Sequence, residues 1–478
     1  MTPLTRFAVS TFFAAGLTFV IASLAARSDH SPIPVYPGSP DRPLWGEDTR
    51  ANTDASGLAQ QEPSLAISRR DSDVIVVAAK DFRETDNISR SVWIYTSHDG
   101  GRTWPWNQSF PKVSDRIFRH SDPVAVARDD GRLYVITLGT GKPVPDNHGL
   151  FITWSDDDGV TWHNAVTVTA QKRTGFDDKE WLAIDQAPGS PYYHRMHVAW
   201  RPAEIEALWS TYSTNGGLTW SDPITAATGD VHSAYPLVDA NGRLLIFFAD
   251  PLNIDVPGSI RFVTSEDGGE TFGPPRPVID TLQPKSPLNE NDRFRVLGII
   301  SAATDPSDAK RLYVAWTDAR DAEANGADAL LTYSHDAGAT WSQPIRLSSE
   351  PPGRARDDFL PVLHAGARGR LHALWMDRRG DPGNVFTHAI YRASDDGGVT
   401  WGPSSRVSDV SFDLNLGLPE NSPSPGDYWG LDSVGGRVCA AWIDTRTGEE
   451  DVYVDCAWMA DLGLMYFLPA RIRMRDEG

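Results

Sequence analysis

The chain has 478 residues but only two cysteines, and its basic residues are outnumbered by acidic ones. With 44 Lys and Arg against 64 Asp and Glu, the formal net charge is −20, which argues against binding to nucleic acid and to anionic membrane surfaces. The sequence also lacks a Walker loop, a zinc-ligand spacing, a nucleophile elbow and an EF-hand pattern. We therefore expect neither a metal ion nor any other cofactor.

An uncharged apolar run is present at the N-terminus, from Phe7 to Ala26, directly after Arg6. It fits a secretory signal peptide, but about twenty apolar residues also suffice to cross a bilayer as an uncleaved anchor. Residues 1–26 are therefore predicted as a signal peptide or an N-terminal membrane anchor. We expect an exported protein, either secreted, periplasmic or anchored with its folded part outside the cytoplasm. The polar, proline-bearing residues 27–58 are predicted as a linker.

One octapeptide occurs six times: Ser, any residue, Asp or Asn, any residue, Gly, any residue, Thr, and Trp or Phe. The copies begin at Ser97, Ser155, Ser213, Ser265, Ser334 and Ser394, at spacings of 58, 58, 52, 69 and 60 residues. Asp or Asn followed by Gly suits a tight loop, because the carboxyl or amide group can accept backbone N–H groups and Gly tolerates positive φ. A short motif at this period indicates one supersecondary unit that is repeated, as in propellers and solenoids.

Short β-rich runs surround each octapeptide. Before the first copy lie residues 63–67, 74–79 and 92–96, and runs such as 344–347 follow a copy. Each unit is thus predicted to supply strands A, B and C, the octapeptide as a turn, and a strand D. The runs at 429–431, 438–442 and 452–456 repeat strands A to C a seventh time, a degenerate octapeptide follows at 459–466, and 470–474 is expected to be strand D.

The count of units predicts the architecture. We expect an all-β fold, a seven-bladed β-propeller of four-stranded antiparallel blades, over residues 59–474, with a tail at 475–478. The alternative is a six-bladed propeller with an extra sheet. A hairpin about Thr447-Gly448 in the seventh unit would place Cys439 opposite Cys456. In an exported protein this pair favours a disulfide, and two buried free thiols are the alternative.

The octapeptide resembles the Asp-box, or BNR repeat, of the sialidase superfamily, and the chain is identified as an atypical member with seven units, where sialidases usually have six blades. The resemblance implies a glycoside hydrolase with an arginine triad that grips the substrate carboxylate, an Asp acid/base, and a Tyr nucleophile assisted by Glu. The family's opening motif, Arg-Ile-Pro-Ser-Leu, corresponds to residues 61–65 here, so Gln61 replaces the first arginine of the triad.

Other positions match the family motifs. The resemblance assigns Arg83, in Asp81-Phe82-Arg83, to the second arginine, Asp86 to the acid/base, and Tyr428 to the nucleophile. No motif fixes the third arginine or the helper Glu. The implied catalytic residues are therefore Tyr428, Asp86 and Arg83.

Propeller geometry sorts the remaining charged residues by face. The octapeptides lie on one face, the box face, and the B-to-C and D-to-A connections lie on the other, the funnel face. Several B strands end there in Asp-x-Arg, and arginine offers two parallel donors to a carboxylate or sulfate. Predicted ligand-binding residues are Arg320, Arg379, Asp377, Asp318, Arg446 and Glu180. The alternative for each Asp-x-Arg is a salt bridge within its own loop.

Three functions follow from these observations. The first is an exported sialidase-like propeller that binds an acidic glycan at its funnel face and, if the matched residues act as in sialidases, hydrolyses it. The second is a non-catalytic envelope or extracellular propeller that binds glycan or protein. The third is a polysaccharide lyase, because His and Tyr on the funnel face could serve as acid and base. We expect a monomer in each case.

Overall fold

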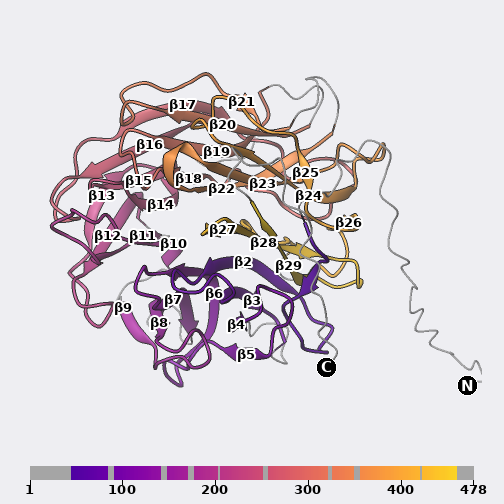
Figure 1. Cartoon of the computed structure of the whole chain (residues 1–478), viewed down its shortest axis with the longest axis horizontal. Helices are drawn as coiled ribbons and strands as arrows, with labels where there is room; N and C mark the ends of the chain where they lie inside the picture. The colour runs from indigo at the N-terminus through magenta and orange to yellow at the C-terminus, as the bar shows by residue number, and fades with distance from the viewer. Residues whose placement is uncertain are drawn as a thin grey trace, which may run out of the picture.

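The computed structural model describes residues 45–83, 91–141, 148–170, 177–202, 205–250, 257–320, 326–348, 356–419 and 423–459. Within these ranges the strands form seven antiparallel sheets, which follow one another around a ring (Figure 1). The predicted all-β, seven-bladed propeller is confirmed, and the six-bladed alternative is excluded. The one helical element in the described ranges is the short 3-10 turn η1 (Ala367–Gly369).

Each blade contributes its first strand to the centre of the ring and its later strands toward the outside. The first three blades consist of β2 (Gln60–Ile67), β3 (Ile75–Asp81), β4 (Ser91–Ser97) and β5 (Trp106–Ser109); β6 (Ile117–Ala127), β7 (Leu133–Gly141), β8 (His148–Ser155) and β9 (Val166–Ala170); and β10 (Asp177–Ile184), β11 (Met196–Pro202), β12 (Ala207–Ser213) and β13 (Ile224–Thr228).

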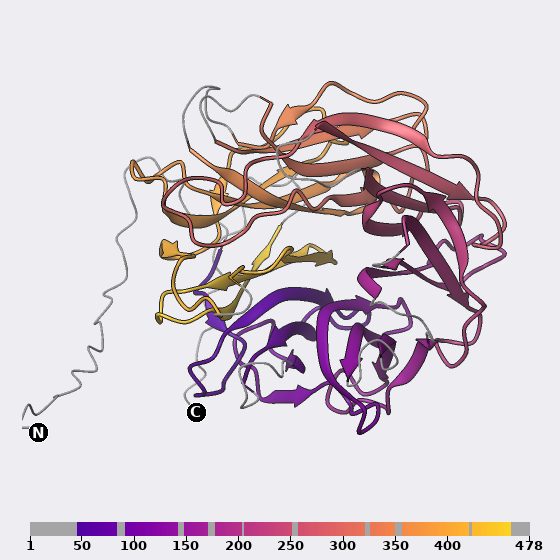
Figure 2. The ribbon, with the colours of Figure 1, turned by 180° about the vertical axis from the view of Figure 1, so that it is seen from behind.

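The next three blades repeat this order, as the view from behind also shows (Figure 2). They consist of β14 (His232–Val238), β15 (Leu244–Asp250), β16 (Pro257–Ser265) and β17 (Arg276–Leu282); β18 (Ser301–Thr304), β19 (Leu312–Asp318), β20 (Asp328–Ser334) and β21 (Ile345–Arg346); and β22 (Asp358–Ala365), β23 (Leu371–Asp377), β24 (Phe386–Ser394) and β25 (Ser405–Arg406), with β26 (Phe412–Asp413) beside β24.

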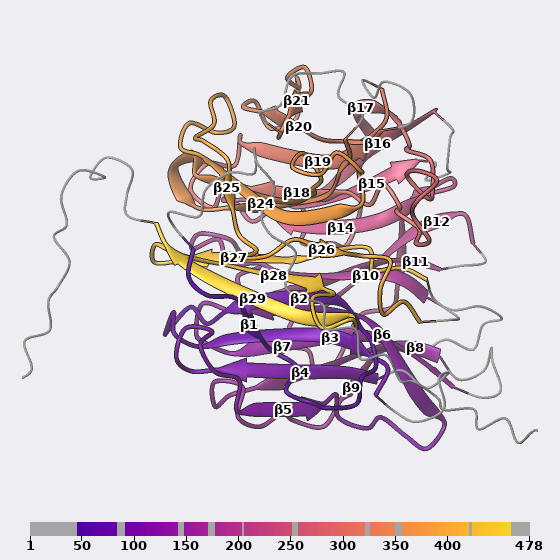
Figure 3. The ribbon, with the colours of Figure 1, turned by 90° about the vertical axis from the view of Figure 1, so that its right-hand side faces the viewer.

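The seventh blade joins the two ends of the chain. Its inner strands are β27 (Gly430–Val434), β28 (Arg437–Asp444) and β29 (Asp451–Trp458), and its outer strand is β1 (Thr49–Arg50), which pairs antiparallel with β29 (Figure 3). The ring is therefore closed by hydrogen bonds between N-terminal and C-terminal segments. Residues 49–50 belong to the propeller and not to the predicted linker. The strand expected at 470–474 lies outside the described residues, as does the degenerate octapeptide beyond Met459.

The six octapeptides form the predicted turns between third and fourth strands. In the first, Ser97 Oγ donates to Asp99 Oδ1 at 2.8 Å and accepts from the Gly101 N–H at 2.9 Å. Asp99 also accepts from the Thr103 N–H and hydroxyl, at 2.9 and 2.7 Å. Gly101 has a φ of 88°, a conformation that glycine adopts without steric cost. The Ser, Asp and Thr side chains of the motif are thus hydrogen-bonded within the turn.

A disulfide links Cys439 and Cys456, which face each other across β28 and β29. The predicted pairing is confirmed, and it supports an extracytoplasmic protein, where disulfides persist. No helix among the described residues has the length and apolarity needed to cross a membrane. The predicted signal or anchor at 1–26 lies outside these residues.

A repeated irregularity shapes the centre of the ring. Five innermost strands carry a register shift at the same place, and each shift contains one non-glycine residue with φ between 50° and 60°. These residues are Glu62, Asp122, Lys179, Ser233 and Leu360. A bulge of this kind bends the strand and redirects its side chains. Four of the five, all but Glu62, line a cavity on the funnel side of the ring.

Candidate functional site

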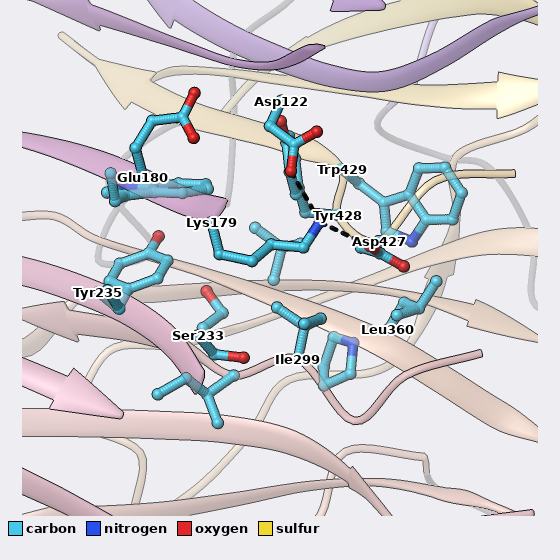
Figure 4. A pocket seen from close by; sticks show the side chains of 16 residues that line it. Asp122, Lys179, Glu180, Ser233, Tyr235, Ile299, Leu360, Asp427, Tyr428 and Trp429 are labelled. Carbon is cyan, nitrogen blue, oxygen red and sulfur yellow. Dashed lines mark hydrogen bonds and ion pairs between the residues drawn. The ribbon is translucent and has the colours of Figure 1, made fainter. Parts of the chain in front are cut away.

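The cavity at the centre of the ring is the candidate site, and we call it the axial cavity (Figure 4). It is lined by residues from the first strands of several blades and from the segments just before them: Asp122, Lys179, Glu180, Trp181, Ser233, Ala234, Tyr235, Ile299, Ile300, Ser301, Leu360, Pro361, Val362, Asp427, Tyr428 and Trp429. Of the predicted site residues that the structure describes, Glu180 and Tyr428 are in this lining.

Lys179 occupies the middle of the site. Its Nζ lies 2.6 Å from Asp427 Oδ2, 2.9 Å from Asp122 Oδ2 and 3.5 Å from Glu62 Oε1. Figure 4 shows its side chain reaching between Asp122 and Asp427. Burial opposes the charge on Lys179, but the three carboxyl groups outweigh it and raise its pKa well above the usual value. The amine is therefore a fixed cation and is not free to form a Schiff base.

The carboxyl groups around Lys179 differ in protonation. Burial disfavours ionisation of Asp122 and Asp427, yet the ammonium group of Lys179 lowers the pKa of both. Burial, reinforced by the charge of Asp122, raises the pKa of Glu180 well above its usual value. Both Glu180 carboxyl oxygens are enclosed and have no hydrogen-bond partner among the described residues. The site thus combines two carboxyl groups whose pKa is lowered with one, Glu180, whose pKa is raised and whose oxygens have no hydrogen-bond partner among the described residues.

The axial cavity is narrow. It leaves about 30 Å³ for the centres of water molecules, which is room for roughly two waters. Trp181, Tyr235 and Trp429 form its floor, since they also line a second cavity of about 220 Å³ that opens toward the box face. Trp181 and Tyr235 stack with ring centroids 4.6 Å apart. A whole sugar ring does not fit in the axial cavity as it stands, but one of its substituents does.

Tyr428 lies inside the site but is not arranged as an activated nucleophile. Its hydroxyl group donates a hydrogen bond to the Pro123 carbonyl oxygen at 3.0 Å. Burial raises the pKa of Tyr428 well above 10, and the nearby carboxyl groups, Glu62 first, raise it further. The phenol is therefore protonated and directed at the main chain.

Gln61, at the position of the first sialidase arginine, is fully buried. Its Nε2 donates to the Ser424 carbonyl oxygen and to Glu450 Oε2, the latter at 2.9 Å. The side chain therefore ties the first blade to the seventh and does not reach the axial cavity.

The predicted arginines at the ends of the B strands are held by their own loops. Arg320 binds Asp318, and Arg379 binds Asp377, through two nitrogens each at 2.5–2.9 Å. Each aspartate also accepts the indole N–H of the tryptophan two residues before it, at 2.7 Å from Trp316 in the first pair. Arg446 binds Asp444 through one nitrogen at 2.6 Å, and Asp444 accepts the Trp442 indole N–H at 3.3 Å, but the same guanidinium group also binds Asp48 and Asp409.

Arg83 binds Asp81 at 2.6 Å and stacks on Trp93 at 3.7 Å from the ring centroid. The salt bridge within each loop, the alternative in the sequence analysis, is thus what the structure contains. None of these four arginines is among the residues that line the axial cavity. Asp86 lies outside the described residues.

Four polar residues that the sequence analysis did not single out lie close to the groups around Lys179: Asp178, Arg201, His232 and Arg295. His232 Nε2 lies 3.7 Å from Asp178 Oδ2. Burial, then the charges of Lys179 and Arg201, lower the pKa of His232 to about 3, so the imidazole is neutral at physiological pH. The run Asp177-Asp178-Lys179-Glu180 at the start of a buried strand was the feature of the sequence that could have predicted this cluster. Charged side chains are rarely buried unless they are paired with one another.

No cluster of His, Cys, Asp and Glu able to hold a metal ion is found in the described part of the chain. The negative charge of the buried Asp122 and Asp427 carboxylates is instead balanced by the ammonium group of Lys179.

Comparisons with known proteins show what this chain is similar to. A family model described as a BNR repeat-like domain matches residues 40–275. A sialidase of Micromonospora viridifaciens is 26% identical over 393 residues, which cover 77% of this chain and 56% of that protein. This chain therefore spans little more than half the length of that relative.

Two solved structures match most of the length of this chain. The Hadza microbial sialidase Hz136 superposes with a TM-score of 0.46 and 15% identity, over 86% of this chain and 67% of its own. A polysaccharide lyase of family PL25, an ulvan lyase, superposes with a TM-score of 0.48 and 9% identity, over 85% of this chain and 96% of its own.

The chain is a BNR-repeat, sialidase-like β-propeller with seven blades. Through the Micromonospora enzyme, it is a distant homologue of a sialidase.

Proposed function

We propose that the protein binds a glycan at the funnel face, directly above the axial cavity. The observation that carries this proposal is the unpartnered Glu180 carboxyl group, enclosed in a cavity beside the aromatic rings of Trp181 and Tyr235. Sugar hydroxyl groups satisfy carboxyl groups, and aromatic rings pack against the apolar parts of a ligand. A single sugar hydroxyl fits the space, so the ring itself would lie above it. The kinship to a sialidase supports a carbohydrate ligand.

Glycoside hydrolysis is a second candidate, and the split protonation of the carboxyl groups favours it. The pKa of Glu180 is raised by burial, whereas the pKa values of Asp122 and Asp427 are lowered by the charge of Lys179. Glycosidases pair a protonated acid with an ionised carboxylate, and their environments push the two pKa values apart. The sialidase mechanism itself has less support, because Gln61 replaces an arginine and the Tyr428 hydroxyl group is bound to a main-chain carbonyl.

Binding and turnover can be measured separately on the full chain with a panel of acidic and neutral oligosaccharides. We expect saturable binding in calorimetry, weakened about tenfold by Glu180→Ala through the loss of a buried hydrogen bond. Glu180→Gln keeps a donor at the same place and should retain binding, while any hydrolysis should be lost. The proposal is contradicted if no glycan binds, or if Glu180→Ala leaves binding unchanged.

Tyr428→Phe tests the sialidase mechanism in the same assay. We expect binding and any turnover to persist, with the free energy of unfolding reduced by about 1 kcal/mol because the Pro123 carbonyl loses its donor. Turnover lost with binding intact would instead support a tyrosine nucleophile.

A further inference from the structure

The box face has cavities of its own at the centre of the ring. A depression of about 660 Å³ lies among the turns that follow the innermost strands. It shares Arg69, Thr304, His364 and Ala365 with the cavity of about 220 Å³ described above, which we call the box-face shaft. The depression is therefore the mouth of the shaft. Its volume lies in the range of roughly 300–1,000 Å³ that is usual for sites of small ligands.

Most side chains along the box-face shaft are apolar. Its wall consists largely of Ala, Val and Leu from the innermost strands, and Trp181, Tyr235 and Trp429 form its floor. From Trp429 to Ser433, which lines the mouth, the wall is four residues long, or about 13 Å. The three rings also line the axial cavity, so they lie between the two cavities. A ligand in the shaft is thus kept from the funnel face, and the wall favours an apolar buried end.

The mouth of the shaft is rich in positive charge, although the chain has a net charge of −20. The depression is lined by one carboxylate, Asp129, and by four arginines, Arg69, Arg368, Arg370 and Arg437. Three of these arginines, all but Arg368, form an ion pair with an aspartate. The guanidinium group of Arg368 has neither an ion pair nor a hydrogen bond among the described residues. It is therefore the cation at the mouth that can bind an anionic group.

A strained turn holds Arg368 in this position. Arg368 belongs to η1 and has a φ of 65°, a left-handed conformation that is unfavourable for a non-glycine residue. Its N–H donates to Ser307 Oγ at 2.9 Å, and the Gly369 N–H donates to Asp305 Oδ2 at 2.5 Å, so the fifth blade fixes this turn of the sixth. Strained residues of this kind persist only where the surrounding structure fixes them, and they are frequent at ligand sites. The strain and the unpaired guanidinium group both point to Arg368 as a ligand-binding residue.

We propose that the box face carries a second ligand site, for a small amphipathic carboxylate whose charged head binds Arg368 and whose apolar tail enters the box-face shaft. The unpaired guanidinium group selects the head, and the aliphatic wall with its aromatic floor selects the tail. A free acid fits better than a lipid within a membrane, because the net charge of −20 opposes approach to an anionic surface. The site goes beyond glycan binding at the funnel face and does not depend on it.

Straight-chain carboxylates from acetate to decanoate, and the alcohols of equal length, test the site by calorimetry on the full chain, below their micellar concentrations. The wild-type protein should bind the longer carboxylates at one site, with an affinity that rises about fourfold per methylene group until the tail reaches the floor. The alcohols should bind about tenfold more weakly, because they lack the charge-assisted hydrogen bond. Vesicles of anionic phospholipid should not bind.

Two variants separate the head from the tail. Arg368→Gly should weaken the carboxylates about tenfold and leave the alcohols unchanged, and the turn should persist because glycine adopts this φ without strain. Ala365→Trp, at a partly exposed position where the depression meets the shaft, should remove the dependence on tail length. Arg102→Ala is the control for charge, since it removes an exposed arginine of the first octapeptide, and it should change affinity less than twofold.

The site is overturned if affinity does not rise with tail length in the wild-type protein, or if the rise persists in Ala365→Trp. It is also overturned if Arg368→Gly binds the carboxylates as tightly as wild type, or if the protein binds the vesicles and not the free acids. Glu180→Ala, in the axial cavity, should leave carboxylate binding unchanged. Failure of this site and failure of the funnel-face site can therefore be told apart.

Discussion

Lys179 shows how a single residue decides the chemistry of the funnel. Its ammonium group is bound by carboxyl groups from three other innermost segments, and the four groups together hold the first, second, third and seventh blades at the axis. A buried charge is tolerated only when it is paired and hydrogen-bonded. The centre of this propeller is consequently an ionic cluster, with more exposed charged groups such as Arg295 beside it.

Replacing Lys179 by methionine should be strongly destabilising, because it leaves ionised Asp122 and Asp427 without their cation. We expect the free energy of unfolding to fall by about 3–5 kcal/mol, the usual result of removing one partner of a buried ion pair. Chemical denaturation followed by tryptophan fluorescence would measure it.

Lys112→Met is the matched control for this change. Lys112 is 71% exposed and pairs with exposed Asp115, so its replacement should change stability by no more than about 0.5 kcal/mol. Equal stability of the Lys179→Met and wild-type proteins would mean that the carboxyl groups around Lys179 are not ionised.

At the scale of elements, the repeat unit completes its own polar groups. The octapeptide forms hydrogen bonds within its own turn, and in each Trp-x-Asp-x-Arg sequence the aspartate binds both the tryptophan and the arginine of its own loop. A unit of this kind can be repeated along a chain because its polar groups need few hydrogen-bond partners from neighbouring units. The seventh blade differs, since its outer strand comes from the other end of the chain.

Asn52 tests this closure. Its Nδ2 donates to Asp451 Oδ1 at 2.7 Å and its Oδ1 accepts from the Val452 N–H at 2.9 Å, so it fastens the N-terminal segment to β29. Asn52→Ala should lower the free energy of unfolding by about 2–3 kcal/mol, since two buried bonds are lost and their partners remain. Asn291→Ala, at an exposed loop position, is the control. Similar unfolding curves for the two variants would show that this contact does not secure the ring.

At the scale of the whole molecule, the two faces of the ring have different roles. The box face carries the self-contained turns, whereas the funnel face carries the axial cavity and the charged rim. Closure of the ring involves charge as well as hydrogen bonds. Asp48, next to β1, accepts from the Asp409 N–H at 2.7 Å and from Arg446 at 2.6 Å, joining the chain end to the sixth and seventh blades.

The stability of the closed ring should decrease as the pH rises toward 8. Burial, and then the hydrogen bond shared with the Asp409 side chain, raise the pKa of Asp48 to about 8. A carboxyl group whose pKa is higher in the folded than in the unfolded protein stabilises the fold below its unfolded pKa. That contribution is lost as the pH rises through the folded value, by at most about 1.4 kcal/mol per pH unit.

Thermal unfolding from pH 5 to 9 would measure this effect. Asp48→Asn should have a shallower pH profile than wild type over this range, because the amide does not titrate. Asp115→Asn, at an exposed position, should follow the wild-type profile. Parallel profiles for Asp48→Asn and wild type would rule out the contribution of Asp48.

The sequence by itself determined the repeat, the number of blades, the two faces and the disulfide. Each of these follows from residue patterns within a single unit. The Ser, Asp, Gly and Thr of the octapeptide close one turn, and the hairpin about Thr447-Gly448 sets Cys439 opposite Cys456. Residues that are in contact within one unit are also close in the sequence. Their spacing in the chain is therefore enough to predict which of them lie side by side. Even the Asp-x-Arg salt bridges belong to this class.

Only the tertiary structure decided which charged side chains meet at the axis of the ring and which partners they have there. Lys179 meets Asp427, 248 residues away, because the ring brings innermost strands of different blades together. The closing strand at residues 49–50 likewise depends on β29, some 400 residues later. A linear sequence contains no signal for such pairings, because they are set by the curvature that the repeats accumulate around the ring.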